Sequence, residues 1–217
     1  ESALSGVTVP GVPFLILGHN DSIAWGFTTP HADTQDIFIE QVDPNNPAHY
    51  LTPDGSQPFE TSEERFLNGD REIIETFRST RHGPVLSDIW SNAKRSDGQT
   101  VLTLSAASFN AGDNTAESFL RLNRAGSVDE ALAALEDFSS PPQNVTLADR
   151  HGNIALLLAG RIPERRTGNG FMPANGATGS EDWIGWVDRD RLPFLYNPES
   201  GMVVQANERL LFRDPTL

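Results

Sequence analysis

Cysteine is absent from all 217 positions of this sequence. Its absence excludes disulfide bonds, thiolate metal sites and a cysteine nucleophile. It does not define the cellular compartment, because many proteins of oxidising compartments also lack disulfides. Long apolar runs are missing as well, since none reaches the roughly 18 residues that a membrane-spanning helix needs. Residues 1–5 show no basic region followed by an apolar run, so they do not predict a signal peptide.

Positive charge is scarce. The chain has 16 Lys and Arg residues against 30 Asp and Glu residues, which gives a formal net charge of −14. A phosphate backbone and an acidic membrane surface would both be repelled, so we expect neither a nucleic-acid partner nor a membrane partner. Hydrophobic residues make up 37% and charged residues 21%, as in globular proteins. The length allows one large domain or a core with a smaller insertion.

Strand and turn signals dominate the hydrophobic pattern, and helix signals are few. Asn68-Gly69-Asp70 predicts a hairpin turn. Two short helices are expected after Thr115 and after Ser127, where Ser127 and Glu130 have the spacing of a capping box. The remaining expected strands include a hairpin over 145–149 and 154–159 and a closing strand over 202–206. These signals predict an α+β fold with much antiparallel sheet.

The composition of the sequence changes at about residue 41 and again at about residue 100. Between these two positions, loop and turn residues alternate with short β-prone segments. We therefore expect an inserted β-rich subdomain at 41–100. The core would then consist of 1–40 and 101–217.

Four motifs in a fixed order are the most informative part of the chain. The first runs from Gly18-His19-Asn20-Asp21 through Ile23-Ala24-Trp25-Gly26-Phe27-Thr28-Thr29 and is followed by Asp33 and Asp36. The others are Asp149-Arg150-His151-Gly152-Asn153-Ile154, then Leu192-Pro193-Phe194 with Asn197-Pro198-Glu199-Ser200-Gly201, and finally Val204-Gln205-Ala206-Asn207. Their order and spacing resemble the penicillin acylase family of N-terminal nucleophile (Ntn) amidohydrolases.

The resemblance covers nearly all of this chain but only part of the family's protein. It implies a partial Ntn-hydrolase antiparallel sheet with a small β-rich insertion and a few short helices. Family members are made as a precursor that cuts itself into a small and a large subunit. The expected partners are therefore the small subunit and the remainder of the large subunit, and the expected location is periplasmic or secreted. The substrate would be a small-molecule acyl amide.

Catalysis in this family uses an N-terminal Ser whose own α-amine serves as general base. We expect that Ser to lie outside this chain, because neither Ser2 nor Ser5 aligns with it, and we expect the isolated chain to be inactive. By resemblance, the Asn207 amide and the Thr29 backbone N–H donate hydrogen bonds to the oxyanion. From residue type alone, Asn207 is more typical of a turn after a strand and Thr29 of a strand end.

The resemblance also implies a structural calcium site and part of an acyl pocket. Asp33, Asp36, and the backbone oxygens of Gln35 and Pro173 would be calcium ligands, although two Asp residues in a loop are usually only solvated. The other ligands would fall outside the chain, which leaves the occupancy of a partial site open. Leu17, Phe27 and Gln143 would line the pocket, while plain core packing is the alternative for Leu17 and Phe27.

Three functional hypotheses remain at this point. The parent protein is an acylase that cleaves a β-lactam side chain, an N-acyl-homoserine lactone or another N-acylated amine. Alternatively, the chain is a non-catalytic α+β domain with a weak calcium site. A third class is a β-rich binding module that uses Trp183, Trp186 and Tyr196 as stacking platforms, which leaves the position of Asn207 unexplained.

Overall fold

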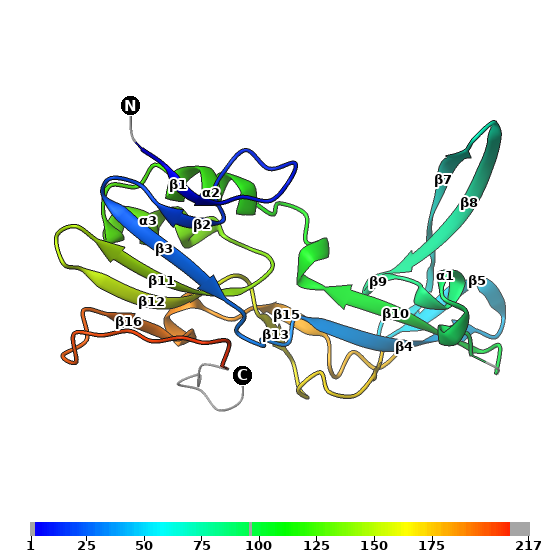
Figure 1. Cartoon of the computed structure of the whole chain (residues 1–217). Coiled ribbons are helices and arrows are strands. Elements are labelled where there is room, and N and C mark those ends of the chain that lie inside the picture. Colours follow the sequence, from blue (N-terminus) through cyan, green and yellow to red (C-terminus); the bar gives the residue numbers. More distant parts are fainter. Residues whose placement is uncertain (1–2, 96, 209–217) are drawn as a thin grey trace. The chain divides into compact units, whose positions relative to one another are not determined.

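The computed structural model describes residues 3–95 and 97–208, and these residues form two compact units (Figure 1). Unit 1 contains the residues up to 33, residues 110–163 and the residues from 186 onward. Unit 2 contains residues 34–109 and 164–185. The β-rich segment expected at 41–100 lies within unit 2, which also includes residues 34–40, 101–109 and 164–185. Ser2 lies outside the described residues.

Unit 1 is built on a six-stranded antiparallel sheet with the order β1-β2-β3-β11-β12-β16. Its strands are β1 (Ser5–Val7), β2 (Leu17–His19), β3 (Ile23–Thr28), β11 (Gln143–Asp149), β12 (Ile154–Ala159) and β16 (Phe194–Tyr196). The hairpin predicted near 145–159 is confirmed as β11 and β12. The closing strand predicted over 202–206 is wrong, because the strand that pairs with the edge of β12 is β16.

Two helices cover one face of this sheet: α2 (Thr115–Leu122) and α3 (Val128–Ala134), the latter followed by the 3-10 turn η3 (Leu135–Asp137). The Ser127 hydroxyl accepts a hydrogen bond from the Glu130 N–H at 3.2 Å, which confirms the predicted N-cap. Thr115 is not a cap, because its hydroxyl accepts the N–H groups of Ser139 and Ser140 instead. Trp25, Val145, Leu147, Leu122 and Leu135 belong to the buried core.

Unit 2 contains a five-stranded sheet with the order β10-β4-β5-β6, in which β14 pairs with β4 in parallel. Its strands are β4 (Gln35–Asp43), β5 (Asn46–Thr52), β6 (Gly55–Pro58), β10 (Thr100–Ala106) and β14 (Ala174–Asn175). Tyr50, Phe59, Val85 and Val101 form a buried cluster there. Phe38 on β4 is fully buried.

A three-stranded sheet with the order β7-β8-β9 completes most of unit 2. Its strands are β7 (Glu60–Asn68), β8 (Arg71–Thr80) and β9 (Gly83–Pro84), and β13 (Pro163–Arg165) pairs separately with β15 (Trp183–Trp186). Gly69 has φ 62° in the two-residue turn that joins β7 to β8, which confirms the predicted hairpin. Figure 1 shows this hairpin extending well beyond β9.

The remaining elements are short: α1 (Leu86–Ile89) and the 3-10 turns η1 (Ser91–Ala93), η2 (Ala107–Phe109) and η4 (Arg189–Arg191). Among the described residues, no helix is long and apolar enough to cross a membrane. Strands far outnumber helices, and most neighbouring strands run antiparallel, as the α+β prediction requires.

Candidate active site

The two residues predicted to stabilise an oxyanion lie in contact. β3 ends at Thr28, and the backbone N–H of the next residue, Thr29, donates a hydrogen bond to Asn207 Oδ1 at 3.0 Å. The two residues are 178 positions apart in the sequence. Asn207 has φ 63°, in the left-handed region that Asn tolerates better than most residues. Backbone conformations of this kind are concentrated at functional sites.

This hydrogen bond determines which atom of the Asn207 amide can donate. Thr29 occupies the amide oxygen, and within the part of the chain that the structure describes the Nδ2 group donates no hydrogen bond, so it can donate to a ligand. Thr29 thereby orients the Asn207 amide. The expected role of Thr29 as a second oxyanion donor stays a prediction, and it requires that its N–H turn from Asn207 Oδ1 to the substrate oxygen.

Three buried polar atoms that have no hydrogen-bond partner within residues 3–95 and 97–208 lie beside this contact. They are Thr28 Oγ1, Asn144 Oδ1 and Gln205 Nε2. Asn144 is fully buried on β11 directly opposite Thr28, and its Nδ2 donates to the Glu208 carbonyl at 3.4 Å. Gln205 Oε1 in turn accepts the Glu208 N–H at 3.3 Å. Such orphan atoms are uncommon in folded proteins, and their grouping here indicates a site built to receive further polar atoms.

Sequence reasoning missed Asn144. Asn144 alternates with Val145 and Leu147 along β11, so it points to the face opposite the helix-covered core. On that face its neighbours on β11 are Thr146 and Ala148, and an Asn in such a strand gives no local signal of a site. Its place opposite Thr28 is visible only in the structure.

The three residues expected to line the acyl pocket do not share one face of the sheet. Phe27 lies on the helix-covered face with Trp25, and Gln143 shares that face with Val145, the cross-strand partner of Phe27. Leu17 precedes Gly18, the cross-strand partner of Trp25, so it points to the other face. The pocket role of all three residues stays a prediction.

Phe27 packs against an aromatic cluster on the helix-covered face of the sheet. Its ring centroid lies 5.4 Å from that of Phe119 in an edge-on arrangement and 6.1 Å from that of Phe138. Phe14 stacks on Phe119 at 4.8 Å. Phe27 is only half-buried, so it is at once part of the core and accessible from one side. This arrangement is compatible with both interpretations that the sequence left open.

Asp36, one of the expected calcium ligands, forms an ion pair inside unit 2. Asp36 is buried and accepts hydrogen bonds from Arg165, with Nε to Oδ2 at 2.7 Å and Nη2 to Oδ1 at 2.9 Å. The Trp183 indole N–H also donates to Oδ2. The roles of Asp33, Gln35 and Pro173 as calcium ligands stay predictions. Among the described residues, no group of three Asp, Glu or His side chains could hold a metal ion.

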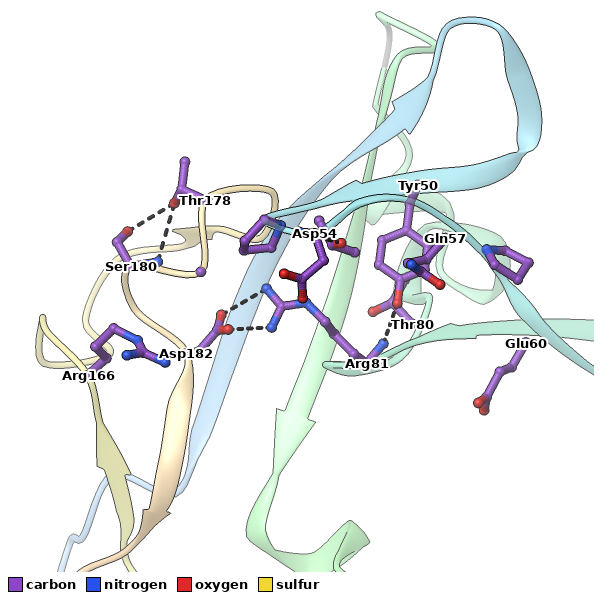
Figure 2. A pocket seen from close by; sticks show the side chains of 14 residues that line it. Tyr50, Asp54, Gln57, Glu60, Thr80, Arg81, Arg166, Thr178, Ser180 and Asp182 are labelled. Atoms are coloured by element: carbon purple, nitrogen blue, oxygen red, sulfur yellow. Dashed lines mark hydrogen bonds and ion pairs between the residues drawn. The ribbon is translucent and has the colours of Figure 1, made fainter.

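A second polar cluster in unit 2 lies beside a cavity of about 770 Å³ (Figure 2). Arg81 and Asp182 line this cavity and form an ion pair, with Nη2 3.0 Å from Oδ1. Behind them, His82 lies between Glu40 (Nδ1 to Oε1, 2.6 Å) and Asp182 (Nε2 to Oδ1, 2.9 Å). Burial alone would raise the pKa of Asp182, but hydrogen bonds from Arg81 and His82 hold it below its usual value. None of the predicted site residues lines this cavity.

The antiparallel sheet of unit 1, with the Thr29–Asn207 contact directly after β3, is compatible with the expected Ntn-hydrolase fold. Comparison with known proteins agrees with this class. Residues 2–216 match the family model described as penicillin amidase. The chain therefore belongs to the penicillin amidase family, which confirms the resemblance seen in the motifs.

The relatives are named as acylases. Acyl-homoserine lactone acylase QuiP of Pseudomonas aeruginosa is 32% identical over 214 residues, covering 94% of this chain and 25% of the relative. Penicillin acylase 2 proenzyme of Pseudomonas sp. strain SE83 is 30% identical over 217 residues, covering 96% and 26%. The solved structure of thermostable penicillin G acylase from Alcaligenes faecalis matches with a TM-score of 0.82 at 26% identity, covering 95% of this chain and 36% of that chain. The chain spans about a quarter of the length of these curated relatives.

Proposed function

We propose that this chain is part of an acylase that hydrolyses a linear acyl amide through an acyl-enzyme. The nucleophile would be an N-terminal Ser supplied by another part of the same precursor. The observation that carries this proposal is the contact between Thr29 and Asn207, two residues that the family register assigns to the oxyanion site. The names of the relatives support the same reaction class.

In the proposed reaction, the Ser hydroxyl attacks the acyl carbonyl and the carbonyl oxygen gains negative charge. Asn207 Nδ2 donates a hydrogen bond to this oxygen, while Thr29 keeps the amide turned toward it. A donor held in place before the reaction stabilises the developing charge without reorganisation cost. The amine then leaves, and water releases the acid from the acyl-enzyme.

The proposed substrate is an N-acyl-homoserine lactone or a related N-acylated amine, with a β-lactam side chain as the alternative. Relatives named for both substrate classes align with almost the whole chain at similar identity, so the acyl group is the variable to test. Phe27 and Gln143 are the residues on which we base an acyl-pocket role. Export of the whole protein to the periplasm is part of the proposal and rests on the family resemblance.

The binding-module hypothesis is less well supported. It requires exposed, coplanar aromatic side chains. The Trp183 indole N–H instead donates a hydrogen bond to Asp36. Trp186 is half-buried, and the Arg161 guanidinium lies over its ring, 5.8 Å from the ring centroid. An aromatic ring that is already covered on one face is a poor stacking platform. Family membership favours the acylase.

The test uses the full-length protein and a panel of N-acyl-homoserine lactones, phenylacetyl amides and glutaryl amides. Asn207→Asp keeps an oxygen that accepts from Thr29 but removes the Nδ2 donor. We expect kcat to fall by at least about 100-fold in this variant and in Asn207→Ala. The matched control is Asn169→Asp, because Asn169 also uses its Oδ1 to accept a backbone N–H, from Phe171 at 3.2 Å.

The control should retain the activity of the unmodified protein. Full activity in Asn207→Asp would show that Asn207 acts only as an acceptor and would refute the oxyanion role. Absence of turnover on every amide of the panel by the unmodified protein would refute the acylase assignment.

A further inference from the structure

The turn at residues 205–208 carries Asn207, on which the proposed reaction depends most. Gln205 Oε1 accepts the N–H groups of Ala206 at 2.7 Å and of Glu208 at 3.3 Å, and Glu208 Oε2 also accepts the Ala206 N–H, at 2.7 Å. These hydrogen bonds define the conformation of the turn. They all lie within it, so the position of Asn207 against the sheet requires contacts from outside the turn.

Hydrogen bonds from two neighbouring strands tie this turn to the sheet of unit 1. Thr29, directly after β3, donates its N–H to Asn207 Oδ1 at 3.0 Å. Asn144, on β11, donates its Nδ2 to the Glu208 carbonyl at 3.4 Å. The two contacts are neighbours, because Asn144 is the cross-strand partner of Thr28. One contact holds the Asn207 side chain, and the other holds the backbone of the residue that follows it.

Asn144 is well placed to fix the turn. It is fully buried, and β11 is paired on both sides, with β3 and with β12. Burial of an amide is unfavourable unless the amide makes hydrogen bonds, and Asn144 Oδ1 makes none within residues 3–95 and 97–208. An amide with this balance contributes little to stability, so its role is better explained by the position of the turn.

We propose that Asn144 is a positioning residue for the oxyanion site, an inference that rests on the proposed function. By holding the Glu208 carbonyl, it keeps Asn207 where Nδ2 can donate to the substrate oxygen. Asn207 itself is exposed and has φ 63°, so neither burial nor a common backbone conformation fixes it. Misplacing a catalytic group by about 1 Å can cost about 100-fold in rate. Asn144 does not touch the substrate and acts through Asn207.

The first test measures turnover of the amide panel by the full-length protein, Asn144→Ala, Asn207→Ala and the double variant. Asn144→Ala should lower kcat about tenfold and leave KM within about twofold, because the donor is misplaced while substrate binding is retained. In the Asn207→Ala background, Asn144→Ala should cost less than about twofold, because no donor is left to position. A purely structural role would instead give equal losses in both backgrounds.

The matched control is Asn153→Ala. Asn153 also donates its Nδ2, to Asp149 Oδ2 at 2.9 Å, but at the other end of β11. This variant should retain the kcat of the unmodified protein, even where it lowers the melting temperature as much as Asn144→Ala does. Asn144→Val, whose side chain suits a strand, takes the place of Asn144→Ala if that variant does not fold.

A second measurement does not depend on turnover. Hydrogen exchange of the Thr29 amide, followed by mass spectrometry of the full-length protein, reports on its hydrogen bond to Asn207 Oδ1. The next residue is Pro30, which has no N–H, so the Thr29 signal is readily assigned. Asn144→Ala should accelerate this exchange about fivefold, whereas Asn153→Ala should leave it unchanged.

Unchanged Thr29 exchange in Asn144→Ala would overturn the proposal. In an active protein, an unchanged kcat of Asn144→Ala or equal losses in both backgrounds would overturn it as well. Failure of the proposed function gives a different result, because the unmodified protein would then turn over no amide or Asn207→Ala would keep full activity. If no amide is turned over, the exchange of the Thr29 amide alone decides whether Asn144 positions Asn207.

Discussion

Replacing Gly176 with Ala should destabilise unit 2 through a single steric conflict. A Cβ built on Gly176 lies 2.6 Å from Glu40 Cδ and closer still to Oε2. Non-bonded atoms do not approach a Cβ this closely, so either the Gly176 backbone or the Glu40 side chain must move. Gly176 is not in the positive-φ region, so the substitution adds no backbone strain of its own.

Neither group can move freely. The Gly176 N–H donates to the Ile39 carbonyl at 2.9 Å, which holds its backbone against β4. Glu40 is fully buried, and its Oε1 accepts from Thr80 at 2.8 Å and contacts His82 Nδ1 at 2.6 Å. Its Oε2 has no hydrogen-bond partner among the described residues and lies against Gly176. The missing Cβ is what gives the carboxylate its space.

The size of the destabilisation follows from the strain that Gly176→Ala introduces and the hydrogen bonds that it removes. Overpacking a core costs about 1–3 kcal/mol, and each hydrogen bond lost from a charged group costs about 1.5–3 kcal/mol. Gly176→Ala should therefore lower the free energy of unfolding by about 3–5 kcal/mol, which corresponds to roughly 10 °C in melting temperature for a chain of this size. Urea unfolding monitored by circular dichroism measures the free energy.

The matched control is Gly126→Ala. Gly126 also lacks a positive φ, and the nearest atom to its built Cβ is the flexible end of Glu130 at 3.4 Å. This control should change the stability by less than about 1 kcal/mol. Glu40→Asp shortens the side chain, so its combination with Gly176→Ala should cost less than the sum of the single changes. A loss in Gly176→Ala no larger than that of Gly126→Ala would refute the reasoning.

Two further predictions concern unit 1. Burial alone would raise the pKa of Asp149, but hydrogen bonds from Asn153, Val128 and His151 lower it to about 2. The folded pKa lies below the unfolded value of about 3.9, so this stabilisation is present above about pH 4 and disappears as the pH falls toward 2. Between pH 5 and 2, the melting temperature should therefore fall less steeply in Asp149→Asn than in the unmodified protein. Ser127→Ala should cost about 1 kcal/mol in urea unfolding, because the Glu130 N–H loses its cap; unchanged stability would show that the cap contributes nothing.

Local signals predicted the local parts of the fold. The turn at Asn68-Gly69-Asp70 and the cap at Ser127 depend on residues within a few positions of one another, so their chemistry is visible in the sequence. The strand expected over 202–206 failed for a non-local reason. Its residues favour β-structure, but the edge of β12 is occupied by β16, and β-propensity does not tell whether an edge is available.

The candidate oxyanion pair could not be derived from local pattern either. Thr29 and Asn207 are 178 positions apart, and each is an ordinary residue for its place in the chain. The family resemblance supplied the pairing, because it compares this chain with others whose motifs stand in the same order. Asn144 fell outside every motif and was missed, although its position opposite Thr28 and its hydrogen bond to the Glu208 carbonyl place it next to the same site.

Asp36 shows where an assignment by motif reaches its limit. A carboxylate in a short oxygen-rich segment must be neutralised when it is buried, and either a metal ion or a guanidinium can do this. Which of the two is present depends on the residue that β13 brings to Asp36 from 129 positions away. In this chain that residue is Arg165, so the same Asp that suggests a calcium ligand in the sequence becomes half of an internal ion pair in the structure. A calcium prediction for this chain therefore has to account for Arg165, which already neutralises one of the expected ligands.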